Sequence, residues 1–196
     1  MGLVFEPALP DGSLVVERPG SGQFVLEAFG RAAHVGRDFS AGVNAIGAIA
    51  SRVLEISAKA DPAAGRIVNV GVIRGGVATN VVPERASAWG NARFSGAEAE
   101  RELADAIDAL ATSTDAMPRV SVKRSFARPA KPMTPGVERL AMLARRAAED
   151  LGQSLPFGKT GGVCDGNNMQ AAGIPVIDTL GVRGGGLHTS DEWIVQ

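Results

Sequence analysis

The chain has 196 residues, a formal net charge of −1, 45% hydrophobic residues and 21% charged residues. This composition is that of a globular protein with one domain or two small ones, and the absence of a basic run argues against a nucleic-acid-binding protein. No apolar run approaches the ~20 residues of a membrane span. A single cysteine, Cys164, excludes an internal disulfide and fits a reducing compartment, so a cytoplasmic protein is expected.

Residues 1–13 predict a short strand, Leu3–Phe5, and then a turn punctuated by proline and glycine. A strand this close to the first residue, with no turn or cap before it, predicts the remnant of a larger catalytic domain.

Residues 14–126 alternate between strand and helix patterns. The expected strands span 23–30, 66–74, 85–94 and 118–126. The expected helices span 40–57, with Ser40 as N-cap, and 95–112, with Ser95 and Glu98 as a capping box. The order β-α-β-β-α-β predicts the ferredoxin-like split unit, an antiparallel sheet with two helices on one face.

Residues 127–196 predict an incomplete α/β unit. Thr134 as N-cap and Pro135 at the first helical position predict a helix that ends near Gly152. Ile174–Leu180 is a compact apolar strand of the kind that is buried on both faces of a sheet. The stripe expected to be buried on the helix consists of Leu140, Leu143, Ala144, Ala147 and Leu151. These elements supply too few strands for a complete sheet.

The chain has two histidines, and each lies in a loop rich in small residues. His188 follows three glycines and precedes Asp191 and Glu192, an arrangement that suits a metal ligand oriented by a carboxylate but equally a surface histidine. His34 suits a hydrogen-bond donor to an oxyanion, or an exposed turn residue. A zinc site needs about three or four protein ligands, more than this chain offers.

Three other sites carry weaker signals. Asn80 could bind a ligand carbonyl or simply favour a turn. Arg128 could bind a carboxylate through two parallel hydrogen bonds, or it could be an exposed residue of a linker with no binding role. The loop with Gly161 and Gly162 presents backbone N–H groups near a helix start, as anion cradles do, but it lacks the lysine and Ser/Thr spacing of a nucleotide-binding loop.

In combination, these stretches resemble the co-catalytic zinc peptidases and amidohydrolases that include glutamate carboxypeptidases, succinyl-diaminopimelate desuccinylases and aminoacylases. The glutamate carboxypeptidase-like branch is the most similar. The resemblance covers nearly the whole chain. It rests on Phe5-Glu6-Pro7, Gly30–Gly36, Asn80–Pro83, Arg128-Pro129, Thr160–Asn167 and Gly185–Glu192.

The resemblance implies a role for each candidate residue. His188 matches a zinc ligand, and His34 matches a histidine that enters the partner subunit's active site and polarises the scissile carbonyl. Asn80 matches a substrate contact, and Arg128 matches a residue that binds the substrate carboxylate. Gly161 and Gly162 match the loop lining that carboxylate's pocket.

The resemblance also implies an architecture. Residues 14–126 would form a lid that is also the dimerisation domain, inserted in the catalytic domain of residues 1–13 and 127–196, and the protein would be a homodimer. The family's two-zinc site takes its other ligands and its general base from a His-x-Asp motif and a Glu-Glu pair, which this sequence lacks. The chain is therefore expected to be inactive alone.

Two function classes follow. The first is part of a dinuclear zinc hydrolase that cleaves an amide or peptide bond of a small carboxylate-bearing substrate, either an N-acyl amino acid or a peptide with a C-terminal glutamate. The alternative is a non-catalytic dimerisation or binding module built on the ferredoxin-like unit. A third class, an RNA-binding ferredoxin-like domain, is disfavoured because aromatic residues are only 5% of the chain.

Overall fold

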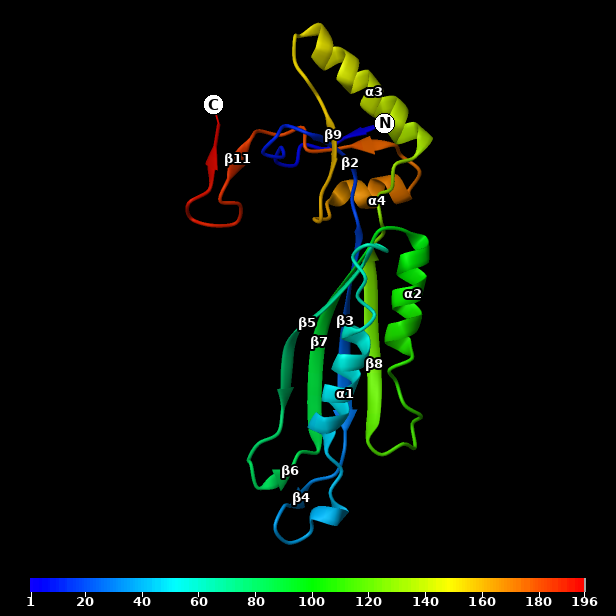
Figure 1. Ribbon diagram of the computed structural model, residues 1–196, viewed down its shortest axis with the longest axis vertical. Coiled ribbons are helices and arrows are strands. Elements are labelled where there is room, and N and C mark those ends of the chain that lie inside the picture. Colours follow the sequence, from blue (N-terminus) through cyan, green and yellow to red (C-terminus); the bar gives the residue numbers. More distant parts are fainter. Residues whose placement is uncertain (196) are drawn as a thin grey trace. The chain divides into compact units, whose positions relative to one another are not determined.

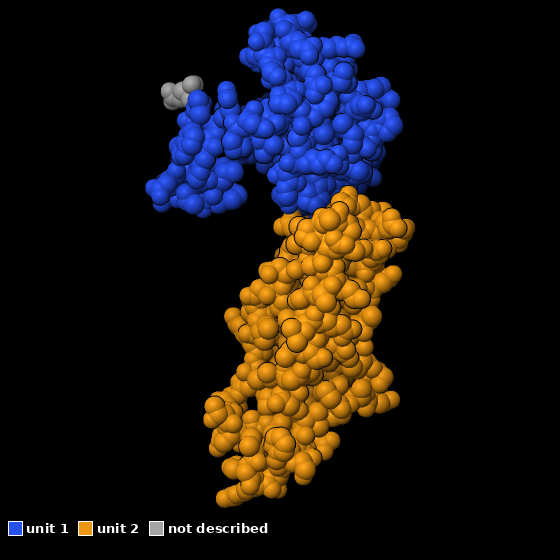
Figure 2. Space-filling view, viewed as in Figure 1, with its two compact units in different colours: residues 1–20, 128–196 blue, residues 21–127 orange. Residues whose placement is uncertain are grey.

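The computed structural model describes residues 1–195. The chain forms two compact units, unit 1 (residues 1–20 and 128–196) and unit 2 (residues 21–127), which Figure 2 distinguishes by colour. Each unit has its own core, so each is described separately.

Unit 2 is an open sheet covered by two helices, as Figure 1 shows. Its strands lie in the order β5-β7-β3-β8, and β5 and β7 pair antiparallel. The element order and this strand order confirm the predicted β-α-β-β-α-β unit. The elements are β3 (Gly20–Phe29), α1 (Ala45–Ser57), β5 (Arg66–Gly75), β7 (Arg85–Phe94), α2 (Ala97–Asp108) and β8 (Arg119–Arg128).

The core of unit 2 follows from the two periodicities of its sequence. In β3 the alternating side chains of Phe24, Leu26 and Ala28 are buried, since every second residue of a strand faces the same side. Helix α2 places Leu103 and Ile107, four residues apart, against this face.

The predicted starts of both helices of unit 2 are wrong. Ser40 lies in a short 3-10 helix, η1 (Phe39–Ala41), and α1 begins later, with Asn44 as its N-cap accepting a hydrogen bond from the Gly47 amide at 2.9 Å. No side chain caps α2, whose N-cap is Gly96. Ser95 is unable to form the capping box because its amide donates to the Gly65 carbonyl at 3.0 Å, in a turn where Gly65 has φ +73°.

Unit 1 consists of short paired strands around two helices. Its elements are β1 (Gly2–Leu3) parallel to β10 (Val176–Ile177), β2 (Leu14–Glu17) parallel to β9 (Phe157–Lys159), α3 (Pro135–Asp150), α4 (Asp165–Ala171), and β11 (Gly184–Gly185) antiparallel to β12 (Trp193–Ile194). The core cluster consists of Leu14, Val16, Val137, Leu140, Ala141 and Ile177. β10 is shorter than the strand predicted over 174–180.

Helix α3 starts as predicted, but only part of the predicted stripe faces the core: Leu140 is buried and Ala144 packs against the core cluster. The Thr134 hydroxyl accepts from the Val137 amide at 3.3 Å, and Pro135 occupies the first turn. The core takes Val137, Leu140 and Ala141, whereas Leu143 is 61% and Leu151 76% exposed. Both the buried and the exposed sets recur every three or four residues, so periodicity alone did not distinguish them.

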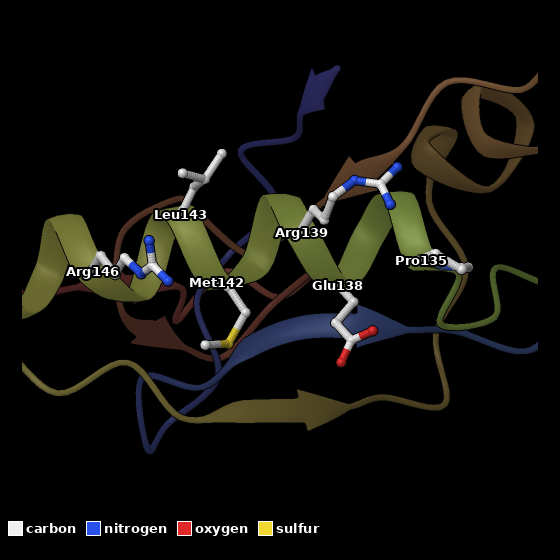
Figure 3. A pocket seen from close by; sticks show the side chains of 6 residues that line it. All are labelled: Pro135, Glu138, Arg139, Met142, Leu143 and Arg146. Atoms are coloured by element: carbon white, nitrogen blue, oxygen red, sulfur yellow. The ribbon is translucent and has the colours of Figure 1, made fainter.

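The outer surface of α3 is mixed in polarity. A shallow hollow runs along it, and Figure 3 shows the side chains that line it. They are Pro135, Glu138, Arg139, Met142, Leu143 and Arg146. None of the candidate site residues lies there.

Candidate functional site

His188 lies at the tip of the β11–β12 hairpin in a conformation that side-chain-bearing residues rarely adopt. Its φ is +65°, and Gly186 two residues earlier has φ +67°. The turn is held locally, since the Thr189 hydroxyl donates to the Gly186 carbonyl at 2.7 Å and accepts from the Asp191 amide at 3.2 Å. Left-handed residues other than glycine cost about 1–3 kcal/mol and cluster at functional sites. The exposed imidazole is thus presented on a defined turn.

The surroundings of His188 do not complete a metal site. Within residues 1–195, no group of three or more His, Cys, Asp and Glu residues lies close enough together to hold a metal ion. A neutral imidazole is a suitable nitrogen ligand for zinc, but a protein site for zinc needs about three or four such donors. His188 therefore fits one ligand position, and the described residues do not fit a dinuclear centre by themselves.

His34 and Asn80 lie next to each other in unit 2. Strand β4 (Ala33–His34) pairs antiparallel with β6 (Val81–Val82), and the Val35 amide donates to the Asn80 carbonyl at 3.0 Å. The Gly36 amide donates to His34 Nδ1 at 3.1 Å. A neutral imidazole that accepts at Nδ1 carries its proton on Nε2, so this contact makes Nε2–H a hydrogen-bond donor.

Arg128 and the glycine loop lie together in unit 1. Arg128 Nη1 lies 2.5 Å from Asp165 Oδ1, in the first turn of α4, immediately after the loop that contains Gly161 and Gly162. Gly161 has no heavy atom within 4 Å of the position that a Cβ would take, so the loop is open there. The N-cap of α4 is Cys164.

Sequence reasoning missed a buried ionic cluster in unit 1. Asp178 is fully buried and lies between two cations, with Arg18 Nη2 at 2.6 Å and Lys131 Nζ at 3.1 Å. A single acidic residue inside the apolar run Ile174–Leu180 was the signal that could have revealed it, since buried charges are normally paired. Arg18 and Lys131 also exchange backbone hydrogen bonds, each at 2.9 Å.

Asn167 joins the same two segments. Its side-chain nitrogen donates to the carbonyls of Pro19 and Pro129, at 2.9 and 2.8 Å, while its oxygen accepts from the Cys164 amide at 3.1 Å. The side chain is thus fully used in a buried position. Together with Asp178, Asn167 holds together the stretches through which the chain enters and leaves unit 2.

Burial shifts two pKa values in this cluster in opposite directions. Loss of solvent lowers the pKa of Lys131 below its ordinary 10.5, against the attraction of Asp178. Loss of solvent also raises the pKa of the Cys164 thiol above 9.0, against the attraction of Arg18. The two groups therefore act oppositely on stability at alkaline pH.

This opposition predicts a pH effect of Cys164→Ala. Above pH 9.0 the unfolded thiol loses its proton while the folded thiol keeps it, so the free energy of unfolding falls as pH rises. For Lys131 the unfolded chain binds the extra proton up to pH 10.5, so stability rises over that window. Cys164→Ala should remove the decrease in the free energy of unfolding that the thiol causes. Urea unfolding at intervals across pH 9.0–10.5 should show a more positive slope for the variant than for the parent chain; an equal slope would contradict the assignment.

Comparison with known proteins identifies similar sequences and structures. A family model described as a peptidase dimerisation domain matches residues 16–116, just over half of the chain. No curated protein sequence matches the chain. No helix among residues 1–195 has the length and apolarity to cross a membrane.

Solved structures match both units. The aminopeptidase PepT of Bacillus cereus is 27% identical with a TM-score of 0.83, and the match covers 98% of this chain and 52% of that one. A tripeptidase of Staphylococcus aureus is 25% identical with a TM-score of 0.84, covering 98% and 51%. The Bacillus subtilis YxeP protein, a dinuclear metal-binding peptidase of the M20 family, shares the fold at 18% identity and a TM-score of 0.68, covering 98% and 51%. The chain thus spans about half the length of these structures.

Proposed function

The chain belongs to the family of M20 peptidase dimerisation domains, and from that premise we propose that it is part of a dinuclear zinc hydrolase that cleaves an amide or peptide bond. The observation that carries this proposal is the match to PepT, which extends over 98% of the chain and therefore over both units. A non-catalytic binding module would need only unit 2 to resemble a peptidase.

In this proposal His188 is one metal ligand, and the remaining ligands come from polypeptide outside this sequence. Zinc, when bound, would supply an activated water and polarise the scissile carbonyl. The contribution of this chain is to present the His188 imidazole on a turn fixed by Thr189 and Gly186. The cytoplasmic location expected from the sequence stays a prediction.

The substrate is proposed to carry a free carboxylate, as an N-acyl amino acid or a short peptide does. Arg128 would bind that carboxylate in place of Asp165, its present partner, and the open loop at Gly161 and Gly162 would line the pocket. A preference for C-terminal glutamate, as in glutamate carboxypeptidases, belongs to this proposal. The tripeptidase match is equally compatible with a short peptide.

His34 is proposed to donate its Nε2–H to the scissile carbonyl, with Asn80 as a neighbouring substrate contact. The hydrogen bond from the Gly36 amide to Nδ1 supports this role because it leaves Nε2 as the donor. A donor aimed at the developing oxyanion lowers the barrier of acyl transfer. By the family resemblance, His34 would act in the partner subunit's site.

A homodimer through unit 2 is proposed. The two edge strands of its sheet differ in their exposed side chains, and this difference favours one edge as the interface. β5 and β8 are the outer strands of the order β5-β7-β3-β8. The edge strand β5 exposes Ile67, Val72 and Ile73, whereas exposed positions of β8 include Lys123 and Arg124. Charged side chains protect an edge from pairing, and an apolar edge invites it. Leu54 of the neighbouring α1 is 73% exposed and extends the apolar surface.

Placing a charge on the proposed edge tests the dimer. Ile73→Lys is expected to convert a dimer to a monomer, because a lysine in an edge strand opposes pairing with a second strand. Ser125→Lys, an exposed position of β8, is the matched control and should leave the mass unchanged. Light scattering measures both. A parent chain that is monomeric at all concentrations, or a dimer that survives Ile73→Lys, would contradict the proposal.

A direct test separates the enzyme proposal from the binding-module alternative. The 196-residue chain alone is expected to bind zinc weakly and to show no turnover of N-acyl amino acids or tripeptides, since it supplies one ligand. Addition of a polypeptide carrying the other ligands should produce metal-dependent hydrolysis that His188→Ala abolishes. Hydrolysis that is absent in the complemented protein, or that is unchanged by His188→Ala, would favour the binding module.

A further inference from the structure

The glycine loop after β9 is contacted by a buried arginine. The Gly162 carbonyl accepts a hydrogen bond from Arg18 Nη1 at 3.1 Å. The loop is bounded by β9, which ends at Lys159, and by Cys164, whose amide donates to Asn167. Between these two ends, Arg18 supplies a side-chain contact to the loop backbone.

Arg18 is itself held rigidly. Its Nε donates to both carboxylate oxygens of Asp178, at 3.0 and 3.1 Å, and its Nη2 donates to Oδ1 at 2.6 Å. Asp178 thus binds the edge of the planar guanidinium formed by Nε and Nη2, and the remaining nitrogen, Nη1, points to the loop. Only 8% of the residue is exposed. Lysine could not replace this geometry, since an ammonium lacks the fixed fork of donors.

Asp178 has no freedom to follow a moving arginine. It lies directly after β10, its amide and carbonyl bond to Val15 of β2 at 3.3 Å each, and Lys131 approaches its second oxygen at 3.1 Å. The next residue, Thr179, accepts from the Val15 amide at 3.0 Å. The carboxylate is therefore part of the packed strand layer of unit 1.

We propose that Arg18 is a positioning residue which, braced by Asp178, fixes the Gly161–Gly162 loop and so the shape of the substrate-carboxylate pocket. The pocket part of this inference rests on the proposed function; the control of the loop by Arg18 does not. The backbone of Arg18 also pairs with the backbone of Lys131. The residue that contacts the loop therefore also joins the two chain segments that lead into and out of unit 2.

The first test measures the loop in the 196-residue chain. Arg18→Lys keeps a cation beside Asp178 but loses the contact to Gly162. The backbone order parameters of residues 160–163 are expected to fall from the rigid range, about 0.85, to below about 0.6, with those of β3 and β7 unchanged. The matched control is Arg145→Lys, which also removes an arginine-to-carbonyl hydrogen bond, to Leu155 at 3.2 Å, outside the loop. Loop order parameters equal to those of the control would overturn the proposal.

A measurement on the unmodified chain protects this test against misfolding of the variant. If Arg18 is fixed as described, its guanidinium N–H signals should be resolved by nuclear magnetic resonance and exchange slowly with water, unlike those of exposed arginines. Averaged, rapidly exchanging Arg18 signals would overturn the proposal without any substitution.

The second test addresses the pocket in the complemented enzyme. Arg18→Lys is expected to raise KM about tenfold for a substrate with a free carboxylate and to change kcat little, because a displaced loop weakens ground-state binding. For the same substrate with its carboxylate amidated, KM should be alike in both proteins. Unchanged KM with lowered loop order parameters would overturn the pocket role and keep the loop role. Absence of any hydrolysis would instead count against the proposed function.

Discussion

Replacing Asp178 with asparagine is expected to destabilise unit 1 by about 3–5 kcal/mol, the usual cost of removing one partner of a buried ion pair. The substitution hardly changes the volume of the side chain, but it leaves Arg18 and the fully buried Lys131 without an anion. Native-state amide exchange measures the effect unit by unit. Protection of β2 and α3 should fall, and that of β3 and β7 in unit 2 should not.

A matched control and a rescue sharpen this prediction. Glu17→Gln removes a surface ion pair with Lys159, whose side chain is 72% exposed, and should change stability by less than about 1 kcal/mol. Adding Lys131→Met to Asp178→Asn should restore part of the loss, since one uncompensated buried cation is removed. A loss below about 1 kcal/mol for Asp178→Asn alone would mean that the cluster is hydrated and not the electrostatic core described above.

Removal of His34 is expected to reduce kcat of the complemented enzyme by about 10²–10³, the usual effect of losing one oxyanion donor. KM should change little, because the contact strengthens only as charge develops on the carbonyl oxygen. His34→Gln is the informative companion, since an amide can still donate, and it should retain more activity than His34→Ala. Equal activity of the parent and His34→Ala proteins would remove His34 from the proposed mechanism.

Mixing two inactive variants tests whether His34 acts across the dimer. In a mixed dimer of His34→Ala and His188→Ala protomers, one site has both an intact His188 and the partner's intact His34. Random mixing of equal amounts should therefore restore about a quarter of the parent activity, because half of the dimers are mixed and each has one intact site. If His34 acts in its own subunit's site, the mixture stays inactive.

Features that depend on neighbouring residues were predictable from the sequence. The strand over 85–94 is found as β7, Arg85–Phe94, because its alternation is written in the chain. The Thr134 cap and Pro135 start of α3 are likewise local. Local signals failed where two candidates competed: Asn44 and not Ser40 caps α1, and a turn at Gly65 takes the Ser95 amide.

The same distinction between local and tertiary features holds for the candidate site. The sequence alone pointed to His188 and His34, because histidines in loops of small residues are visible without a structure. It pointed to Asn80, Arg128 and the Gly161–Gly162 loop chiefly through the resemblance of their motifs to a known family. The sequence also determined the β-α-β-β-α-β order, since periodicity follows from hydrogen bonding within each element. Only the tertiary structure brought Arg18 to Asp178, 160 residues away, and through it to Gly162. Such a pairing leaves no periodic trace, because it depends on how separate strands pack and on which charges that packing removes from water.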